Sequence, residues 1–268
     1  MIKRSLGVLL AGTAAVLLLY FVPERKPPKR TRYHDMVDSA YTVLPAVQGD
    51  SLKLLEKSLS KLQGSARADA LLQTATRWEK VGFPAVAAER YRLAAEAEPA
   101  VAATWAEAGD RFFSLVPGAT QDDERVDYVF HAIYCYEKLL KIDSTDYERK
   151  IRLADCYTDY QGNVMQGVVL LRQVAAADPD NASAQLRLGR FALMSGQTDK
   201  AIERFQAVLS KDSLNLPARV VLAQTLANGQ DIAGAKQVLK EGIALHPDSA
   251  SRQELEGLLL QLGPDPGK

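Results

Sequence analysis

Cysteine and histidine, which often serve in metal sites and nucleophilic catalysis, are scarce in this sequence. Its 268 residues include two cysteines and three histidines. Cys135 and Cys156 are too few for a disulfide scaffold and form no CxxC pair. The zinc-protease pair HExxH, the Walker A loop, the GxGxxG turn and the GxSxG elbow are also absent from the sequence. We therefore expect no enzymatic activity and no cofactor.

One set of side chains leaves a metal-binding alternative open. Asp127, His131 and Cys135 follow an i, i+4, i+8 spacing on one predicted helix face, and Cys156 lies on the next helix. Such a spacing can present zinc ligands. The interpretation that we favour is that both cysteines are buried as small apolar residues and that His131 lies on the helix surface. A metal protein or enzyme using these four residues remains the minor alternative.

Charge is balanced overall but unevenly distributed. The chain has 33 basic and 33 acidic residues, and the first 32 positions hold seven of the basic residues and one of the acidic ones. The remainder, from residue 33 onward, therefore carries 26 basic and 32 acidic side chains, a net charge of −6. A mildly acidic body has no basic footprint for nucleic acid. We expect no nucleic-acid partner.

The only long apolar run is residues 5–22, SLGVLLAGTAAVLLLYFV, which follows a short tail at 1–4. Eighteen helical residues span about 27 Å, close to the hydrocarbon thickness of a bilayer. Tyr20 and Phe21 stand where interfacial aromatic residues anchor a span, and Pro23 ends the helix. Lys3 and Arg4 also fit the n-region of a cleaved signal peptide, but no A-x-A-like site follows. We predict a single-pass, uncleaved anchor in a cell membrane, most simply a bacterial inner membrane.

A basic, proline-rich stalk is predicted over residues 23–33. Five basic residues follow the apolar run and two precede it, which favours a cytoplasmic body under the positive-inside rule. A short n-region before an apolar run also describes exported anchors. The side of the membrane therefore stays open, with the cytoplasmic face preferred.

A regular period runs through the C-terminal half of the chain. Pro179, Ser213 and Pro247 each end an amphipathic segment, and successive members of this set are 34 positions apart. The same interval separates small residues, namely Gly189 from Ala223 and Ala201 from Ala235. Small side chains at these places predict that two helices of a hairpin cross closely, and Gly196 fits a turn that requires positive φ.

The period and these residues resemble the tetratricopeptide repeat family over roughly residues 66–262. The resemblance implies an all-α, right-handed α-solenoid of about five hairpins, preceded by the transmembrane helix. The hairpins are expected within 66–248, at 66–99, 100–145, 146–180, 181–214 and 215–248. The second is longer than the period because of an insertion at 115–127, and the third has one extra residue in its turn. The positions that match the family's packing pattern are Trp78, Gly82, Ala87, Tyr91, Trp105, Gly109, Phe112, Ala132, Tyr136, Tyr157, Gly189, Gly196, Ala201, Phe205, Ala223 and Ala235.

Capping helices are expected at both ends of the solenoid, because the outermost hairpins need cover. Residues 34–65 are predicted to form the N-terminal cap, with a helix that starts at Asp50 or Ser51 and stops at Gly64. A short helix is expected before it, ending near Pro45. Residues 249–263 form the predicted C-terminal capping helix, and 264–268 a tail.

The resemblance also implies a scaffold that holds a peptide in the concave surface lined by the first helix of each hairpin. The positions that correspond to this groove are Leu72, Thr76, Ala106, Asp110, Phe113, Ile151, Asp155, Thr158, Asp159, Leu186, Arg190, Leu193, Val220 and Gln224. Lys and Asn, with which chaperone-binding members grip a terminal carboxylate, are replaced here by apolar, neutral or Asp residues. We expect an apolar segment with basic flanks, held by carboxylates that face solvent in the free protein. Exposed tyrosines near the insertion, such as Tyr128 and Tyr134, are the competing binding element.

These features predict a membrane-anchored scaffold that mediates protein–protein interaction by recruiting or positioning partners at the bilayer. The alternative is an assembly or chaperone-like factor for secretion or cytochrome-maturation machinery. A stable folded partner would favour the scaffold, and many unfolded clients the alternative. Partner identity and oligomeric state stay open.

Overall fold

The computed structural model describes residues 31–263, which form thirteen α-helices and no strand. The predicted all-α solenoid of helical hairpins is confirmed for this part of the chain. The predicted transmembrane run at 5–22, stalk residues 23–30 and the tail at 264–268 lie outside the described residues. Among the helices between residues 31 and 263, none combines the length and the apolar character that crossing a membrane requires.

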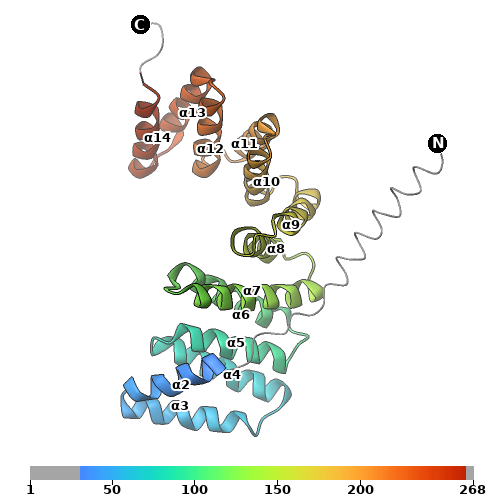
Figure 1. Ribbon diagram of the computed structural model, residues 1–268, viewed down its shortest axis with the longest axis vertical. Helices are drawn as coiled ribbons and strands as arrows, with labels where there is room; N and C mark the ends of the chain where they lie inside the picture. Colours follow the sequence, from blue (N-terminus) through green and yellow to red (C-terminus); the bar gives the residue numbers. More distant parts are fainter. Residues whose placement is uncertain (1–30, 264–268) are drawn as a thin grey trace, which may run out of the picture.

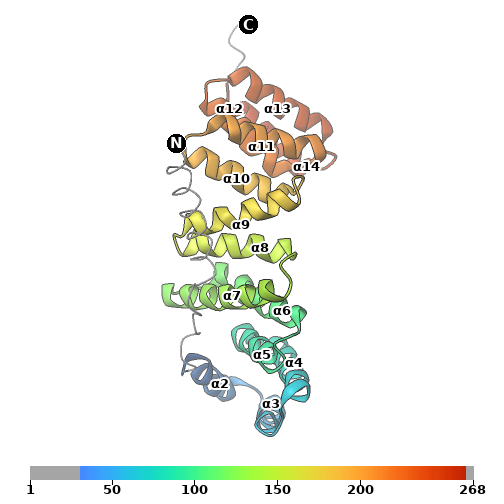
Figure 2. The same ribbon diagram turned by 90° about the vertical axis from the view of Figure 1, so that its right-hand side faces the viewer.

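Ten of the helices pair into five hairpins. The hairpins are α4 (Gly64–Lys80) with α5 (Pro84–Ala97), α6 (Ala102–Leu115) with α7 (Asp122–Ile142), α8 (Tyr147–Asp155) with α9 (Val164–Ala177), α10 (Ala182–Met194) with α11 (Thr198–Lys211), and α12 (Leu216–Asn228) with α13 (Ile232–Leu245). They stack in chain order along the longest axis, with α2 and α3 at one end and α14 at the other (Figures 1 and 2). Each hairpin therefore contacts mainly its neighbours in the chain.

Short polar side chains fix where many of the first helices begin. Asn181 and Asn215, which occupy equivalent places in successive repeats, each accept a hydrogen bond from the backbone N–H three positions later, at 3.0 Å and 3.1 Å. Asp146 caps α8 in the same way. These caps satisfy backbone donors that have no partner inside the helix. Capping residues therefore recur at these helix starts, in addition to the small residues that recur in the core.

Close helix crossing explains the small residues of the repeat. A Cβ atom on Gly189 would lie 2.3 Å from Cε1 of Phe205, and one on Gly109 would lie 2.6 Å from Cε1 of Tyr136. Gly196 adopts φ 73° in the turn after α10. Of the sixteen packing positions, only the turn residues Gly82 and Gly196 are exposed, and the others are buried: Trp78, Ala87, Tyr91, Trp105, Gly109, Phe112, Ala132, Tyr136, Tyr157, Gly189, Ala201, Phe205, Ala223 and Ala235.

Two irregularities fall where the sequence departs from the regular period. The insertion in the second hairpin forms the short 3-10 helix η1 (Val116–Gly118) and extra N-terminal turns of α7, which is 21 residues long. In the third hairpin the first helix ends in a π-helical segment, η2 (Cys156–Tyr160). A π-helical segment absorbs an extra residue without breaking the helix. Both departures leave the order of the hairpins unchanged.

The N-terminal region differs from its predicted boundaries. Helix α2 (Thr31–Val43) begins inside the range predicted as stalk, and α3 (Ala46–Leu59) begins directly after Pro45. Neither Asp50 nor Ser51 caps α3, so that prediction is wrong. Proline, whose φ is fixed and which has no N–H to leave unpaired, starts the helix earlier. Gly64, at φ 54°, stands at the start of α4 (Gly64–Lys80) instead of closing the helix before it.

Helix α14 (Ser249–Gln261) covers the last hairpin, as its C-terminal cap. Asp248 accepts a hydrogen bond from the N–H of Ser251 at 2.7 Å and so starts the helix. Leu255 is fully buried against Ala223 and Leu239. The outer face of α14 exposes Leu260.

Candidate functional site

The predicted groove residues lie on the first helices of the five hairpins, and their exposure differs. Two are buried in the core: Ala106 on α6 and Ile151 on α8, the latter 6% exposed. Neither offers much surface to a peptide. The remaining positions are partly buried or exposed: Leu72, Thr76, Asp110, Phe113, Asp155, Thr158, Asp159, Leu186, Arg190, Leu193, Val220 and Gln224.

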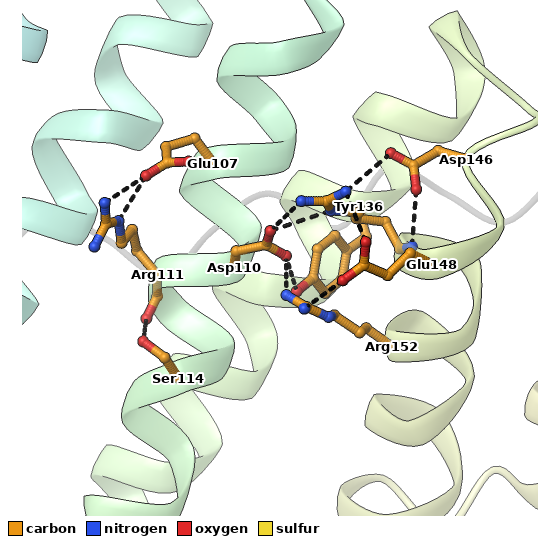
Figure 3. Close-up of polar contacts among 9 residues, drawn as sticks. Glu107, Asp110, Arg111, Ser114, Tyr136, Asp146, Glu148 and Arg152 are labelled. Atoms are coloured by element: carbon orange, nitrogen blue, oxygen red, sulfur yellow. Dashed lines mark hydrogen bonds and ion pairs between the residues drawn. The ribbon is translucent and has the colours of Figure 1, made fainter. Parts of the chain in front are cut away.

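Asp110 is held by residues of the same hairpin and of the next one. Its carboxylate accepts a hydrogen bond from the Tyr136 hydroxyl at 2.9 Å. Arg149 and Arg152, both on α8, approach it to 2.6 Å and 2.5 Å. Figure 3 shows the contact between Asp110 and Arg152. The Asp110 side chain is 18% exposed. Its charge is therefore already neutralised within the protein.

The same arrangement recurs on both sides of Asp110. Glu79 on α4 pairs with Arg111 on α6 at 2.7 Å, between Oε1 and Nη1. Asp155 accepts two hydrogen bonds from Arg187 on α10, at 2.5 Å and 2.7 Å. We call these contacts the ion-pair ladder: Glu79–Arg111, Asp110–Arg149, Asp110–Arg152 and Asp155–Arg187. The ladder joins the first helices of four successive hairpins.

The prediction that Asp110 and Asp155 face solvent, ready for a basic partner, is wrong. Each carboxylate meets an arginine that lies on the first helix of the following hairpin. Bidentate contact with a guanidinium satisfies a carboxylate more fully than a lysine from outside would. The Asp side chains therefore hold the repeats together, and Asp159 keeps the exposed position predicted for it.

A hollow of about 480 Å³ lies on the other side of the solenoid, between the second helices α9 and α11 and against α10. We call it the α9–α11 hollow. Its lining residues are Val164, Met165, Val168, Arg172, Leu188, Phe191, Ala192, Met194, Ser195, Gln197, Lys200 and Arg204. The sequence-based groove prediction named none of them, because it followed the concave face of the first helices.

The α9–α11 hollow combines exposed apolar side chains with positive charge. Met165 is 70% and Met194 75% exposed, values that are high for large apolar residues. Arg172, Lys200 and Arg204 supply three cations, and no lining residue is acidic. Lys200 and Arg204 donate to the amide oxygens of Gln197 and Gln185, at 2.7 Å and 2.5 Å. These neutral partners leave the positive charge of the hollow uncompensated.

Of the four residues of the metal-binding alternative, His131, Cys135 and Cys156 are buried and Asp127 is partly buried. Cys135 and Cys156 are fully buried, as predicted, and burial raises the pKa of both thiols. His131 is 2% exposed and stacks on Phe112 at 4.7 Å between ring centroids, so its predicted surface position is wrong. Asp127 lies 3.6 Å from His131 Nε2 and accepts a hydrogen bond from Tyr33. Within residues 31–263, no three His, Cys, Asp or Glu side chains are placed to hold a metal ion.

His131 is buried because two elements cover it that a helix-surface argument ignores. Phe112 of α6 stacks on one side of the imidazole ring, and Tyr33 of α2 lies edge-on to it at 5.6 Å. Burial, with a smaller effect from the nearby Arg92 guanidinium, lowers the pKa of His131 to about 3. The imidazole is therefore neutral at physiological pH and acts as a packing residue.

Comparisons with known proteins agree with the fold. Residues 160–212 and 192–259 match the model of the tetratricopeptide repeat family. A search of curated proteins gave no match. Among solved structures, a tetratricopeptide repeat protein from Parabacteroides merdae ATCC 43184 is 15% identical with a TM-score of 0.55, over 85% of this chain and 86% of that one.

Two further solved structures resemble this chain to a similar degree. MamA from Desulfovibrio magneticus RS-1 is 18% identical with a TM-score of 0.54, over 66% of this chain and 94% of its own. YrrB, described as a TPR protein with an unusual peptide-binding site, is 17% identical with a TM-score of 0.51, over 76% and 97%. At these identities the likeness concerns the fold alone. The family model thus matches residues 160–259, and the solved structures share the fold of the described chain.

Proposed function

We propose that this protein is a membrane-anchored scaffold that recruits or positions partner proteins at the bilayer. The tetratricopeptide fold is typically a non-catalytic module for protein–protein interaction. The observation that carries the proposal is the α9–α11 hollow, in which exposed Met165 and Met194 stand beside uncompensated cations. Concave sites that combine apolar side chains with a few charged groups are typical of binding surfaces.

The ion-pair ladder supports a scaffold in a different way. A scaffold must present its surface in a constant shape, and each repeat contacts only its neighbours. Arg149, Arg152 and Arg187 tie successive first helices to one another. Binding to a surface that is already ordered avoids the entropic cost of ordering it.

Anchoring is proposed from the sequence of residues 5–22, which lie outside the described part of the chain. An uncharged run of this length, followed by basic residues, is long enough to span a bilayer. The body would then sit close to the membrane surface, and we prefer its cytoplasmic side. Membrane fractionation measures the anchoring, and protease accessibility measures the side.

Chemical crosslinking in intact membranes, followed by purification through a C-terminal tag, tests the scaffold function. The expected result is a small set of folded partners recovered in constant proportion to this chain. Recovery of many unrelated unfolded chains would instead support the assembly-factor or chaperone-like alternative. Recovery of no partner from membranes that contain the full chain would contradict both.

A further inference from the structure

Helix α2 covers the surface between α5 and α7, which we call the α5–α7 surface. Tyr33 of α2 contacts Phe112 of α6, at 6.1 Å between ring centroids, and donates a hydrogen bond to Asp127 of α7 at 2.7 Å. Val37 and Ala40 are buried in the same core cluster as Ala85 and Ala88 of α5. The chain therefore places its own amphipathic helix against two second helices and the first helix between them.

The α5–α7 surface and the α9–α11 hollow occupy equivalent positions in the repeat. Gly109 and Gly189 make the same close approach to an aromatic ring, and the interval between their sequence numbers is 80, as it is between Pro99 and Pro179. The rings that pack on these glycines belong to Tyr136 and Phe205, whose sequence numbers differ by 69. This interval is shorter because the insertion before α7 occurs in the second hairpin alone. The intervals of 80 and 69 therefore relate the two surfaces position by position.

This correspondence pairs residues that α2 covers with residues that line the hollow. At the interval of 80, Ala85 corresponds to Met165 and Phe112 to Ala192; at the interval of 69, His131 corresponds to Lys200. Ala85 and Phe112 are buried in the core cluster that also contains Tyr33, Val37 and Ala40 of α2, and His131 lies edge-on to Tyr33. The second member of each pair lines an open hollow. One surface thus has its helix, and the equivalent one lacks it within residues 31–263.

The two surfaces differ in charge around equivalent arginine residues. Arg92 of α5 pairs with Glu89, at 2.7 Å, and with Glu96. Its equivalent in the hollow is Arg172, and the positions equivalent to the two glutamates are Val169 and Ala176. Neither residue can supply a carboxylate to Arg172, which has no ion-pair or hydrogen-bond partner in the described chain. Lys200 and Arg204 add further positive charge.

We propose that the α9–α11 hollow is the docking site for an amphipathic helix of a partner protein, with an apolar stripe and acidic flanks. The stripe contacts Met165, Phe191 and Met194, as Tyr33, Val37 and Ala40 of α2 contact the α5–α7 surface. The acidic side chains pair with Arg172, Lys200 and Arg204. This inference rests on the proposed scaffold function and assigns it a site and a partner chemistry.

Methionine methyl NMR on the full chain tests the site directly. Of the four methionines, Met165 and Met194 line the hollow, and Met36 lies on α2. The probes are two helical peptides that keep the apolar positions of α2 and carry either Glu or Lys at all others. We expect the Glu peptide to shift the Met165 and Met194 signals in a saturable way, leave Met36 unchanged, and bind at least tenfold more tightly than the Lys peptide.

Charge variants test whether the positive charge of the hollow causes the preference for the Glu peptide over the Lys peptide. Arg172→Glu combined with Lys200→Glu should reverse the order in which the two peptides bind. Arg252→Glu, which changes an exposed cation on α14 outside the hollow, should leave that order unchanged. Absence of shifts at Met165 and Met194, shifts at Met36 alone, or equal binding of both peptides would each overturn the inference. A concentration-dependent dimer abolished by the same double change would identify a second copy as the occupant and overturn it too.

Comparison with the crosslinking experiment separates this inference from the proposed function. If native partners are captured equally well by Arg172→Glu/Lys200→Glu, the scaffold function stands and the hollow is not its site. If the Glu peptide binds the hollow but no native partner is captured, the docking chemistry stands and the scaffold function fails. Loss of capture in the double variant, with capture retained in Arg252→Glu, supports both.

Discussion

Arg187 on α10 binds Asp155 on α8 through two parallel hydrogen bonds, Nε to Oδ1 at 2.5 Å and Nη2 to Oδ2 at 2.7 Å. The contact joins the first helices of the third and fourth hairpins, where the side chains are 35% and 15% exposed. This contact occupies the Asp155 carboxylate, which the sequence analysis assigned to partner binding. The relationship therefore moves Asp155 from recognition to the stability of the repeat interface.

Replacing Asp155 should destabilise the protein by a measurable amount. Asp155→Asn removes the charge from a bidentate contact that is partly shielded from solvent, and we expect a loss of about 1–2 kcal/mol in the free energy of unfolding. Urea unfolding of Asp155→Asn, Arg187→Gln and the double variant gives the coupling energy. Asp180→Asn is the matched control, because the side chains of the Asp180–Lys211 pair are 61% and 60% exposed. Equal effects at Asp155 and Asp180 would contradict a structural role for the ladder.

Filling the helix crossing at Gly189 should destabilise its hairpin. The added methyl of Gly189→Ala would lie 2.3 Å from the Phe205 ring, which is fully buried, so the ring or the two helices must shift. Overpacking of this kind costs about 1–3 kcal/mol. Gly257→Ala in α14 is the control, since nothing lies within 4 Å of its added Cβ, and there the better helix propensity should stabilise by about 0.5–1 kcal/mol. Thermal unfolding measures the change in stability for both variants. A change of the same sign in the two would contradict the crossing geometry.

Stability should fall with acidification because His131 is buried in its neutral form. Its pKa is about 3 in the folded protein, below the ordinary value of 6.5, so the unfolded chain binds more protons between these values. The contribution of His131 is therefore complete above pH 6.5 and is lost as pH falls toward 3, by up to about 1.4 kcal/mol per pH unit. Urea unfolding measured between pH 7 and 4 should show that the free energy of unfolding falls less steeply with decreasing pH in His131→Phe than in the unmodified protein.

The control for this prediction is His34→Gln, because His34 is exposed and pairs with Asp38 at 3.7 Å on the surface. The free energy of unfolding of His34→Gln should depend on pH as it does in the unmodified protein. Asp127 stands 3.6 Å from His131 and would favour protonation, but it also accepts the hydrogen bond from Tyr33. A steeper slope for His131→Phe would show that Asp127 outweighs burial.

Residues 5–22 should remain in the mature protein and hold it in the membrane. Intact-mass measurement of the native protein is expected to include these residues, and removal of residues 1–30 should release the body from the membrane fraction. Protease treatment of intact and permeabilised spheroplasts then reports which side the body faces. A mature chain that begins after residue 22 would contradict the anchor.

The repeat could be predicted from the sequence because it depends on local and periodic constraints. Gly189 must be small wherever a ring packs on the helix backbone, and Gly196 must adopt a positive φ to end its helix in so short a turn. Such requirements recur at a fixed spacing along the chain and can be detected without coordinates. The order of hairpins follows, because each apolar face must be covered by its neighbour.

Only the tertiary structure decided which polar residues are free. Asp110 and Arg149 are 39 positions apart, and no local pattern indicates that the stacking of the third hairpin on the second brings them together. Likewise, the amphipathic pattern of α2 predicts a helix with one apolar face but not the surface that receives it. The insertion lengthens α7, and Asp127 near the start of that helix accepts the hydrogen bond from Tyr33. The equivalent surface at α9 and α11 is an open hollow. Spacing along the chain determines helices and close crossings, whereas pairing between helices depends on how the hairpins stack in space.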